Sequence, residues 1–241
     1  MKEAFAMQRR FESWESPHLG RPMDLLRFGD RGFPFIFFPT SMGKYVQYED
    51  AGLIAALAPT IEAGNIQVLC VDSVDRESWY AEAAPPAARG RRHEQYDAYV
   101  RFEVVPHAQR LGATPVVGVF GCSFGAYHAA NLAGRHPEVI GKAVCLSGVF
   151  DVKRFTDGYW DDVDYFNSPA AYIENMDAGW TERLARIDWT IATGEFDSLA
   201  PENRAFAELL TRKGIPHRAE IWPGVTGHDW EYWNANVPRF I

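Results

Sequence analysis

The chain has 241 residues, 47% of them hydrophobic, which is typical of one globular α/β domain long enough to bury a large core. Its formal net charge of −8 argues against nucleic acid or an anionic membrane as a partner, because no basic stripe offsets the negative charge. The one basic run, at residues 89–93, is interpreted as a solvated loop that leads into a helix, with an anion site as the alternative.

Three cysteines, Cys70, Cys122 and Cys145, lie within or beside apolar runs. An odd number of cysteines at such positions indicates small buried side chains rather than disulfides.

The N-terminus lacks the apolar stretch of a signal peptide, and no apolar run is long enough for a membrane helix. We therefore expect a cytoplasmic protein with no membrane partner. A homo-oligomer is compatible with the sequence, which does not determine the oligomeric state.

Two antiparallel edge strands open the predicted fold, at residues 11–14 and 23–28. After them, apolar β-type runs alternate with helical segments. In chain order, we expect a strand at 33–39, a helix at 48–63, a strand at 66–71, a helix at 93–111, a strand at 114–120, a helix at 126–133, strands at 140–147 and 189–193, a helix at 201–213, a strand at 217–222 and a last helix from 230. This alternation implies βαβ units with right-handed crossovers. The sequence therefore predicts one α/β domain over residues 1–241, with helices on both faces of a mostly parallel sheet and an N-terminal antiparallel hairpin.

Residues 149–186 interrupt this alternation, because they are irregular in pattern and rich in aromatic side chains. We interpret them as a small helical excursion over the carboxyl edge of the sheet, where it would cover part of a site. The alternative is an ordinary crossover between two strands, with its aromatic side chains packed on the sheet beneath.

The most informative motif is GCSFG at residues 121–125, between a predicted buried strand and an Ala-rich helical segment. A serine in a sharp strand-to-helix turn adopts a strained backbone, and glycines two residues to either side remove the Cβ atoms that would clash. A bare G-x-S-x-G motif occurs by chance in about one chain of this length in twelve. The flanking strand and helix favour the nucleophile elbow of the α/β-hydrolases, with Ser123 as the nucleophile. Cys122 is expected to pack beneath the turn.

Two acids, Glu195 and Asp197, follow the strand predicted at 189–193. Side chains in loops at the carboxyl ends of parallel strands meet at one edge of the sheet, so either acid could orient a histidine. We favour Asp197, because a carboxylate further along the loop can turn back toward the site, and Glu195 remains open. The alternative is that these acids cap the positive N-terminus of the helix that follows.

His228 follows the last predicted strand in a loop that contains glycine, from which it can project across the sheet edge. A neutral imidazole can take the Ser123 proton near neutral pH, and a carboxylate would hold its tautomer. His128, five residues after Ser123, is the rival base. The helix carries His128 away from the hydroxyl, so we interpret it as a packing or surface residue.

Acyl transfer also needs backbone N–H groups that point at the developing oxyanion. One is expected from Phe124, immediately after the nucleophile. The other is expected from the loop at residues 39–43, with Ser41 as the first choice and Met42 as the second.

With nucleophile, acid and histidine in this order, the chain resembles the putative-esterase branch of the α/β-hydrolases. That branch includes esterase D (S-formylglutathione hydrolase), feruloyl and acetylxylan esterases and the mycolyltransferases. The resemblance runs nearly end to end and rests on residues 16–23, 104–106, 121–127 and 227–230, with Tyr232 and Trp233. The chain is most similar to small bacterial members of the branch, with which it shares residues 48–50, 71–73 and 78–80.

By this resemblance, Ser123 is the nucleophile, His228 the base and Asp197 the acid, and Ser41 and Phe124 supply the oxyanion donors. Two departures from the family pattern are present. Many relatives have Met after the nucleophile, where this chain has Phe124. Several branches begin the oxyanion loop with His-Gly or Asp-Gly, whereas the loop of this chain at residues 39–43 reads Pro-Thr-Ser-Met-Gly.

The resulting hypothesis is a serine carboxylic-ester hydrolase that acts on a small-molecule ester through a covalent acyl-enzyme, without a cofactor. Metal-ligand spacings such as H-E-x-x-H or C-x-x-C are absent from the sequence, so no metal is predicted. Acyl transfer to an alcohol or thiol uses the same triad and is the alternative, and a non-catalytic binding protein on the same fold is a third hypothesis. Aromatic residues expected near the carboxyl edge are the candidates for substrate contact: Trp79, Tyr80, Trp160 and Trp230.

Overall fold

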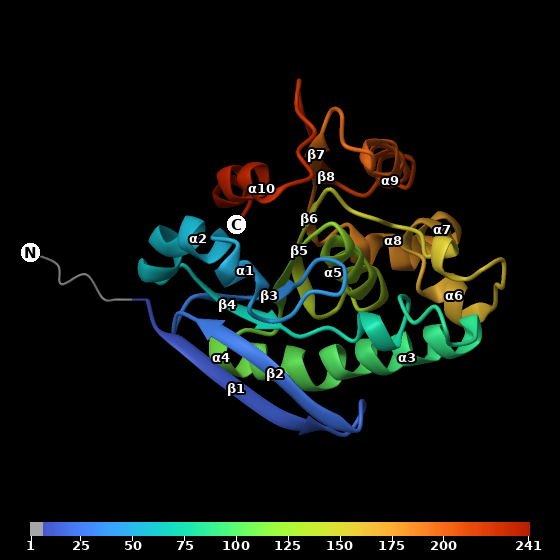
Figure 1. Ribbon diagram of the computed structural model, residues 1–241. Helices are drawn as coiled ribbons and strands as arrows, with labels where there is room; N and C mark the ends of the chain where they lie inside the picture. The colour runs from blue at the N-terminus through green and yellow to red at the C-terminus, as the bar shows by residue number, and fades with distance from the viewer. Residues whose placement is uncertain (1–6) are drawn as a thin grey trace, which may run out of the picture.

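A computed structural model describes residues 7–241, and its centre is an eight-stranded sheet (Figure 1). In chain order the strands are β1 (Arg9–Ser16), β2 (Arg21–Phe28), β3 (Phe33–Phe38), β4 (Ile66–Val71), β5 (Val117–Cys122), β6 (Ile140–Leu146), β7 (Asp188–Gly194) and β8 (His217–Trp222). Their spatial order is β1-β2-β4-β3-β5-β6-β7-β8. The pairs β1–β2 and β2–β4 are antiparallel, and every later pair is parallel. The predicted sheet, with its N-terminal antiparallel hairpin, is confirmed.

The helices connect these strands. They are α1 (Gln47–Asp50), α2 (Leu53–Glu62), α3 (Pro86–Tyr99), α4 (Val105–Gly112), α5 (Phe124–Arg135), α6 (Asp162–Phe166), α7 (Pro169–Asn175), α8 (Ala178–Leu184), α9 (Ala200–Arg212) and α10 (Trp230–Asn236). A π-helical turn, η2 (Val100–Val104), joins α3 to α4, and short 3-10 turns lie at η1 (Asp75–Glu77), η3 (Lys153–Phe155) and η4 (Val237–Arg239). Within residues 7–241, no helix is long and apolar enough to cross a membrane.

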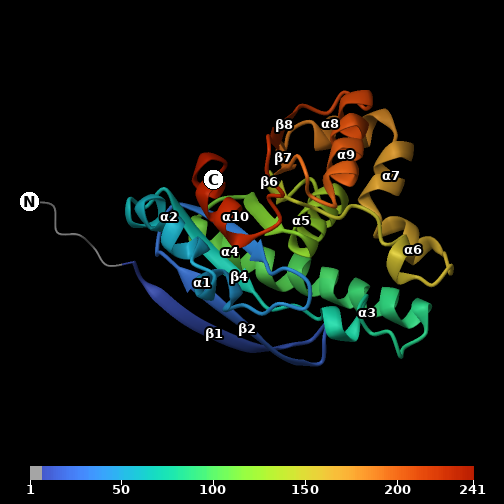
Figure 2. The ribbon, with the colours of Figure 1, turned by 45° about the horizontal axis from the view of Figure 1, so that its top comes forward.

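Each face of the sheet has its own hydrophobic core. In β3, Ile36 and Phe38 belong to one core, and Phe35 and Phe37 belong to the other, as the alternation of side chains along a strand requires. The first core contains residues of α3, α4, α5, α7 and α9, and the second contains residues of α1, α2 and α10. Figures 1 and 2 show these two groups of helices on opposite sides of the sheet. The mostly apolar strands are therefore covered on both faces, which explains why they lack a polar side in the sequence.

The segment at residues 149–186 forms η3, α6, α7 and α8. Its beginning lies near the elbow, because the Phe155 ring is 5.3 Å from the Phe124 ring and 5.0 Å from the Tyr80 ring. Its helices pack on the flank of the domain, with α6 against α3, and α7 against α5 and α9 (Figure 2). The segment expected to extend over the site thus borders it at η3, while α6 and α7 extend the layer that contains α5.

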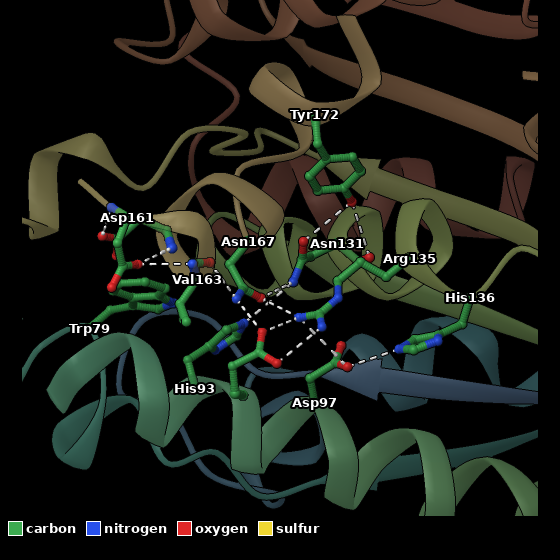
Figure 3. Close-up of polar contacts among 12 residues, drawn as sticks. Trp79, His93, Asp97, Asn131, Arg135, His136, Asp161, Val163, Asn167 and Tyr172 are labelled. Atoms are coloured by element: carbon green, nitrogen blue, oxygen red, sulfur yellow. Dashed lines mark hydrogen bonds and ion pairs between the residues drawn. The ribbon is translucent and has the colours of Figure 1, made fainter. Parts of the chain in front are cut away.

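A polar network ties this segment to α3 and α5 (Figure 3). The Asn167 side chain accepts hydrogen bonds from Asn131 at 2.9 Å and from Arg135 at 2.7 Å, and it donates to Glu94 of α3. Arg135 also donates to Glu94 at 2.6 Å. The Tyr172 hydroxyl adds a hydrogen bond to the backbone oxygen of Asn131 at 3.2 Å. Because Asn131 and Asn167 are fully buried, these bonds provide the partners that buried amide groups require.

Candidate active site

Ser123 occupies a strained turn between β5 and α5. Its backbone has φ 55° and ψ −122°, a conformation that residues other than glycine rarely adopt. The flanking glycines are needed for steric reasons. A Cβ on Gly121 would lie 2.0 Å from the carbonyl carbon of Gly125, and a Cβ on Gly125 would lie 2.2 Å from the backbone oxygen of Phe38. The GCSFG motif therefore meets a packing requirement of this turn, which holds Ser123 at the carboxyl end of β5.

Three side chains that are distant in the sequence meet at this turn. His228 Nε2 lies 3.1 Å from Ser123 Oγ. On the other side of the ring, His228 Nδ1 lies 3.1 Å from each carboxylate oxygen of Asp197. A carboxylate only accepts hydrogen bonds, so Nδ1 carries the proton, and in a neutral imidazole Nε2 is left as the acceptor. This geometry allows His228 to take a proton from Ser123.

The Asp197 carboxylate is buried and has several hydrogen-bond donors. Thr193 Oγ1 and the Leu199 backbone N–H each donate to it at 2.8 Å, in addition to His228. Burial alone would raise the pKa of Asp197, but the hydrogen bonds from His228, Leu199 and Thr193 outweigh burial and hold this pKa below its usual value. The carboxylate therefore stays ionised at neutral pH, as it must to stabilise a protonated imidazole.

Glu195, the other candidate acid, has a different partner. Its Oε2 accepts the backbone N–H of Gly224 at 2.8 Å, which places its carboxylate against the loop after β8. The structure thus brings Asp197, and not Glu195, to His228. The alternative helix-capping role is also realised in part, because Asp197 accepts the N–H of Leu199, the residue before α9.

The loop that carries His228 is set by close packing of backbone on backbone. A Cβ on Gly194, the last residue of β7, would lie 2.1 Å from the backbone oxygen of Thr226. Gly227 has φ 63°, in the left-handed region, and a Cβ there would lie 2.7 Å from the Gly194 nitrogen. Two glycines on neighbouring segments therefore let the His228 loop cross the end of β7, three residues before Asp197.

Two residues that the sequence analysis did not single out support this loop. Ser147, fully buried after β6, donates through Oγ to the Gly227 backbone oxygen at 3.1 Å. Trp233 donates through Nε1 to Ser147 Oγ at 3.2 Å, and its ring packs edge-on against His228 with centroids 5.2 Å apart. A single serine carries no motif, so the sequence offered no signal for Ser147. Trp233 was noted only as part of the family resemblance.

The loop at residues 39–43 follows β3, which pairs with β5, so it lies beside the elbow. Met42, the second choice for an oxyanion donor, has its N–H engaged, because it donates to Asp75 Oδ2 at 2.8 Å. Among residues 7–241, the backbone N–H groups of Ser41 and Phe124 have no acceptor. The two amides expected to bind an oxyanion are therefore free to donate.

The aromatic candidates for substrate contact differ in burial. Trp79 is 1% exposed, and its Nε1 donates to the Tyr127 hydroxyl at 3.1 Å within the core, so its expected role in contacting substrate is wrong. Tyr80 is partly exposed, and its hydroxyl lies 2.7 Å from Ser41 Oγ. Burial raises the pKa of Tyr80, which keeps its hydroxyl protonated. Tyr80 thus contacts the oxyanion loop directly.

The two remaining aromatic candidates differ in what they contact. Trp160 is exposed, with Lys153 Nζ 5.2 Å from its ring centroid. Trp230 is partly buried and packs edge-on against Trp233, which in turn contacts His228. Trp230 therefore lies one side chain away from His228. No contact places Trp160 beside the triad within the described part of the chain.

Two residues close to Ser123 in the sequence have roles in packing. Cys122 is fully buried, and burial raises its thiol pKa well above the usual value, so the thiolate form is suppressed. His128 is buried in α5, where its Nε2 lies 3.0 Å from Asp75 Oδ1. Its partner is thus Asp75, in agreement with the interpretation of His128 as a packing residue.

In residues 7–241, no group of three or more His, Cys, Asp or Glu side chains could hold a metal ion.

Comparison with known proteins places the chain in a family. Residues 47–240 match the family described as "Putative esterase". The chain belongs to this family. The family is one of esterases, so the protein is a carboxylic-ester hydrolase. This is the enzyme class that the sequence predicted, and both that prediction and the resemblance are confirmed. None of the curated protein sequences matches the chain of this putative esterase.

Several solved structures share the fold of this family member. A ferulic acid esterase matches with a TM-score of 0.78 and 15% identity, over 98% of this chain and 96% of that one. An S-formylglutathione hydrolase from Agrobacterium tumefaciens matches with a TM-score of 0.76 and 14% identity, over 99% and 94%. FphF, a fluorophosphonate-binding serine hydrolase of Staphylococcus aureus, matches with a TM-score of 0.73 and 19% identity, over 98% and 97%. At these identities the comparison establishes an α/β-hydrolase fold over the whole length of the chain.

Proposed function

We propose that the protein is a serine esterase in which Ser123 is the nucleophile, His228 the general base and Asp197 the acid. The observation that carries the proposal is the pair of contacts made by His228, 3.1 Å to Ser123 Oγ and 3.1 Å to each Asp197 oxygen. The strained elbow, the buried ionised carboxylate and the membership of an esterase family all support it.

In the first half of the reaction, Ser123 Oγ attacks the ester carbonyl carbon while its proton passes to His228 Nε2. Asp197 stabilises the imidazolium that forms. The oxygen of the tetrahedral intermediate takes the negative charge and accepts hydrogen bonds from the N–H groups of Ser41 and Phe124. When the carbonyl re-forms, the bond to the alcohol breaks, and the alcohol oxygen takes the proton from His228. The product of this half is the acyl ester of Ser123.

In the second half, a water molecule takes the place of the alcohol. His228 removes a proton from the water as its oxygen attacks the acyl carbon, and the oxyanion is bound by the same two amides. Collapse of the second tetrahedral intermediate releases the carboxylic acid and returns the proton to Ser123. Both halves thus use the same base and the same pair of oxyanion donors, so one set of groups is sufficient for the whole reaction.

The substrate is proposed to be a small ester with an apolar group next to the reacting carbonyl. Two large hydrophobic side chains remain exposed in the loops of the triad and the oxyanion site. Phe196, directly before Asp197, is 65% exposed, and Met42, directly after Ser41, is 39% exposed. Exposed apolar side chains of this size next to reactive groups favour contact with an apolar ligand.

A second candidate function is acyl transfer to an alcohol or thiol. It shares the acyl-enzyme with hydrolysis. The two functions differ in what attacks the acyl-enzyme. Product analysis with increasing concentrations of a competing alcohol separates them, since a transferase forms the new ester at low alcohol concentrations and a hydrolase forms mainly the acid.

The direct test is hydrolysis of p-nitrophenyl esters from acetate to octanoate by the wild type and by Ser123→Ala. We expect turnover by the wild type and a loss of at least about 10³-fold in kcat for the variant, with unchanged circular dichroism. The chain length with the highest kcat/KM gives the size of the acyl site. Absence of both turnover and a burst of p-nitrophenol with every ester, or full activity of Ser123→Ala, would contradict the proposal and favour a non-catalytic binding protein.

A further inference from the structure

A buried carboxylate lies behind the loop that carries Ser41. Asp75 is 1% exposed and belongs to η1, in the loop after β4. Its Oδ2 accepts the Met42 backbone N–H at 2.8 Å, and its Oδ1 lies 3.0 Å from His128 Nε2. A carboxylate only accepts hydrogen bonds, so His128 donates through Nε2. Both oxygens of this buried acid therefore have donors.

The three residues of this contact lie after three adjacent strands. Asp75 follows β4, Met42 follows β3, and His128 lies in α5, which follows β5; the spatial order of these strands is β4-β3-β5. His128 also packs edge-on against Phe124, with ring centroids 5.0 Å apart. The carboxylate thus connects the loop of one expected oxyanion donor, Ser41, to the helix of the other, Phe124.

Met42 has a backbone conformation that needs support. Its φ is 55°, in the left-handed region that favours glycine. It is the third residue of a turn closed by the Gly43 N–H, which donates to the Thr40 backbone oxygen at 2.9 Å. In a trans peptide the C=O and N–H point in opposite directions, so the Ser41 N–H points away from the bond that closes the turn. The turn and the contact with Asp75 together fix the direction of this amide.

The segment at residues 75–80 contacts the loop at residues 39–43 a second time, through Tyr80. The Tyr80 backbone N–H donates to the Asp75 backbone oxygen at 3.0 Å, and the Tyr80 hydroxyl lies 2.7 Å from Ser41 Oγ. Asp75 and Tyr80 therefore hold successive residues of the loop, Met42 through its backbone and Ser41 through its side chain.

We propose that Asp75 is a positioning residue for the oxyanion site, anchored by His128. It does not touch the substrate. By holding the Met42 N–H, it keeps the Thr40–Gly43 turn in the conformation that directs the Ser41 N–H toward the same point as the Phe124 N–H. The inference rests on the proposed esterase function, and it adds a residue that controls the oxyanion donors rather than the proton transfer.

The kinetic test compares Asp75→Ala, Asp75→Asn and a matched control with p-nitrophenyl acetate. We expect Asp75→Ala to lower kcat about 10- to 100-fold with KM within about threefold, because an oxyanion donor acts mainly in the transition state. Asp75→Asn should lose less than about fivefold, since its amide oxygen can still accept the Met42 N–H while its N–H₂ group donates to His128 Nε2 in the other neutral tautomer of the imidazole. The control is Asp97→Ala, which removes a buried carboxylate bonded to His136 at 2.8 Å (Figure 3), and it should keep kcat within about threefold.

A second variant separates positioning from loss of folding. Met42→Gly removes the steric cost of the left-handed conformation, so Asp75→Ala should lower kcat at least about threefold less in a Met42→Gly background than in the wild type, a comparison that cancels the effect of the Met42 side chain on substrate contact. A general destabilisation by Asp75→Ala would not be rescued in this way. If Asp75→Ala and Asp97→Ala lower kcat equally, or if KM rises in place of the fall in kcat, the positioning role is wrong.

Hydrogen exchange of the free protein tests the contact between Asp75 and the Met42 N–H without any substrate. We expect the Met42 amide to exchange at least about tenfold faster in Asp75→Ala than in the wild type, with the amides of β5 unchanged. An unchanged Met42 amide would overturn the inference whatever the activity. Faster exchange with full activity would overturn it as well, because the loop would then not control the rate. An inactive wild type whose Met42 amide is protected would instead contradict the proposed function and leave Asp75 as a clamp without a catalytic consequence.

Discussion

The two sides of the candidate active site are held by different physical means. On the side of β7 and β8, backbone packs directly on backbone, since Gly194 and Gly227 leave no room for a Cβ. On the side of β3 and β4, side chains hold the loop, with Asp75 on the Met42 N–H and Gln47 on the Thr40 N–H. The first side positions His228, the proposed base, and the second positions Ser41, the proposed oxyanion donor. Substitutions on the two sides should therefore affect different parts of the reaction.

The largest expected effect is at the acid of the proton-transfer side. Asp197→Asn should lower kcat about 10³- to 10⁴-fold, because an amide cannot stabilise the imidazolium and its N–H₂ group favours the wrong tautomer of His228. The matched control is Glu195→Gln in the same loop, whose carboxylate bonds to Gly224 and not to His228, and we expect its kcat to stay within about threefold. Steady-state kinetics on p-nitrophenyl acetate measure both. A larger loss in Glu195→Gln than in Asp197→Asn would show that the acid is assigned to the wrong residue.

A smaller effect is expected from the backbone packing on the same side. Gly194→Ala would place a methyl group 2.1 Å from the Thr226 oxygen, so the His228 loop must shift. We expect kcat to fall about 10- to 100-fold, because His228 would move away from Ser123 by a fraction of an ångström or more. Gly179→Ala is the control, since a Cβ there meets only the Asp177 carboxylate at 3.5 Å. Wild-type kcat in Gly194→Ala would mean that the loop is not held by this contact.

On the oxyanion side, Gln47→Ala should have a milder effect than either of these. Gln47 accepts the Thr40 N–H and donates to Thr40 Oγ1, both at 2.8 Å, but Asp75 and Tyr80 still hold the next two residues. We expect kcat to fall about three- to tenfold with KM unchanged. A rise in KM without a fall in kcat would place Gln47 in substrate binding instead.

The smallest effect on activity is expected at Asp164, which lies in α6 on the flank. It is fully buried, its Oδ1 has no hydrogen-bond partner among the described residues, and burial raises its pKa to about 6. A pKa raised in the folded state favours the protonated form, so its contribution to stability is complete below about pH 4 and is lost as the pH rises toward 6. Asp164→Asn mimics the protonated acid. Its advantage in unfolding free energy over the wild type should grow by about 1–2 kcal/mol between pH 4.5 and pH 8.

Denaturant unfolding of both proteins at the two pH values measures this difference. An advantage that does not change with pH would show that Asp164 is not protonated in the folded protein. kcat of Asp164→Asn should stay within about twofold of the wild type at either pH, since α6 packs on α3 and not on the triad. This outcome would show that Asp164 affects the stability of the protein around α6 and not the geometry of the candidate active site.

The sequence predicted the fold well because its signals are local. Apolar strands such as β3 and β5 alternate with helical segments, and this pattern alone implies a parallel sheet with two covered faces. The boundaries were less accurate for β1, which the structure extends to Arg9–Ser16 from a prediction of 11–14. The solvated loop expected at residues 89–93 is wrong, because α3 begins at Pro86 and buries Arg89 and His93. Most of β1 is exposed or half-buried, so its outer residues lack the apolar pattern on which the prediction depended.

The candidate site was predictable where a motif or its order along the chain carried information. Ser123 was found from its glycines, and His228 and Asp197 from their loops after consecutive strands, and the structure brings these three together. Asp75, Ser147 and Gln47 were missed, because each is a single polar residue whose partner lies on another segment of the chain. The prediction that Trp79 contacts the substrate was wrong for a related reason. Composition does not distinguish an aromatic side chain in a core from one that lines a site.

The central claim is that Ser123 is the activated nucleophile of this fold. It is tested most directly by incubating the wild type and Ser123→Ala with a fluorophosphonate and measuring the intact mass and the labelled peptide. We predict one adduct per wild-type chain, on the peptide that contains Ser123, and none on Ser123→Ala under the same conditions. An unlabelled wild type, or a Ser123→Ala variant labelled to the same extent, would contradict it.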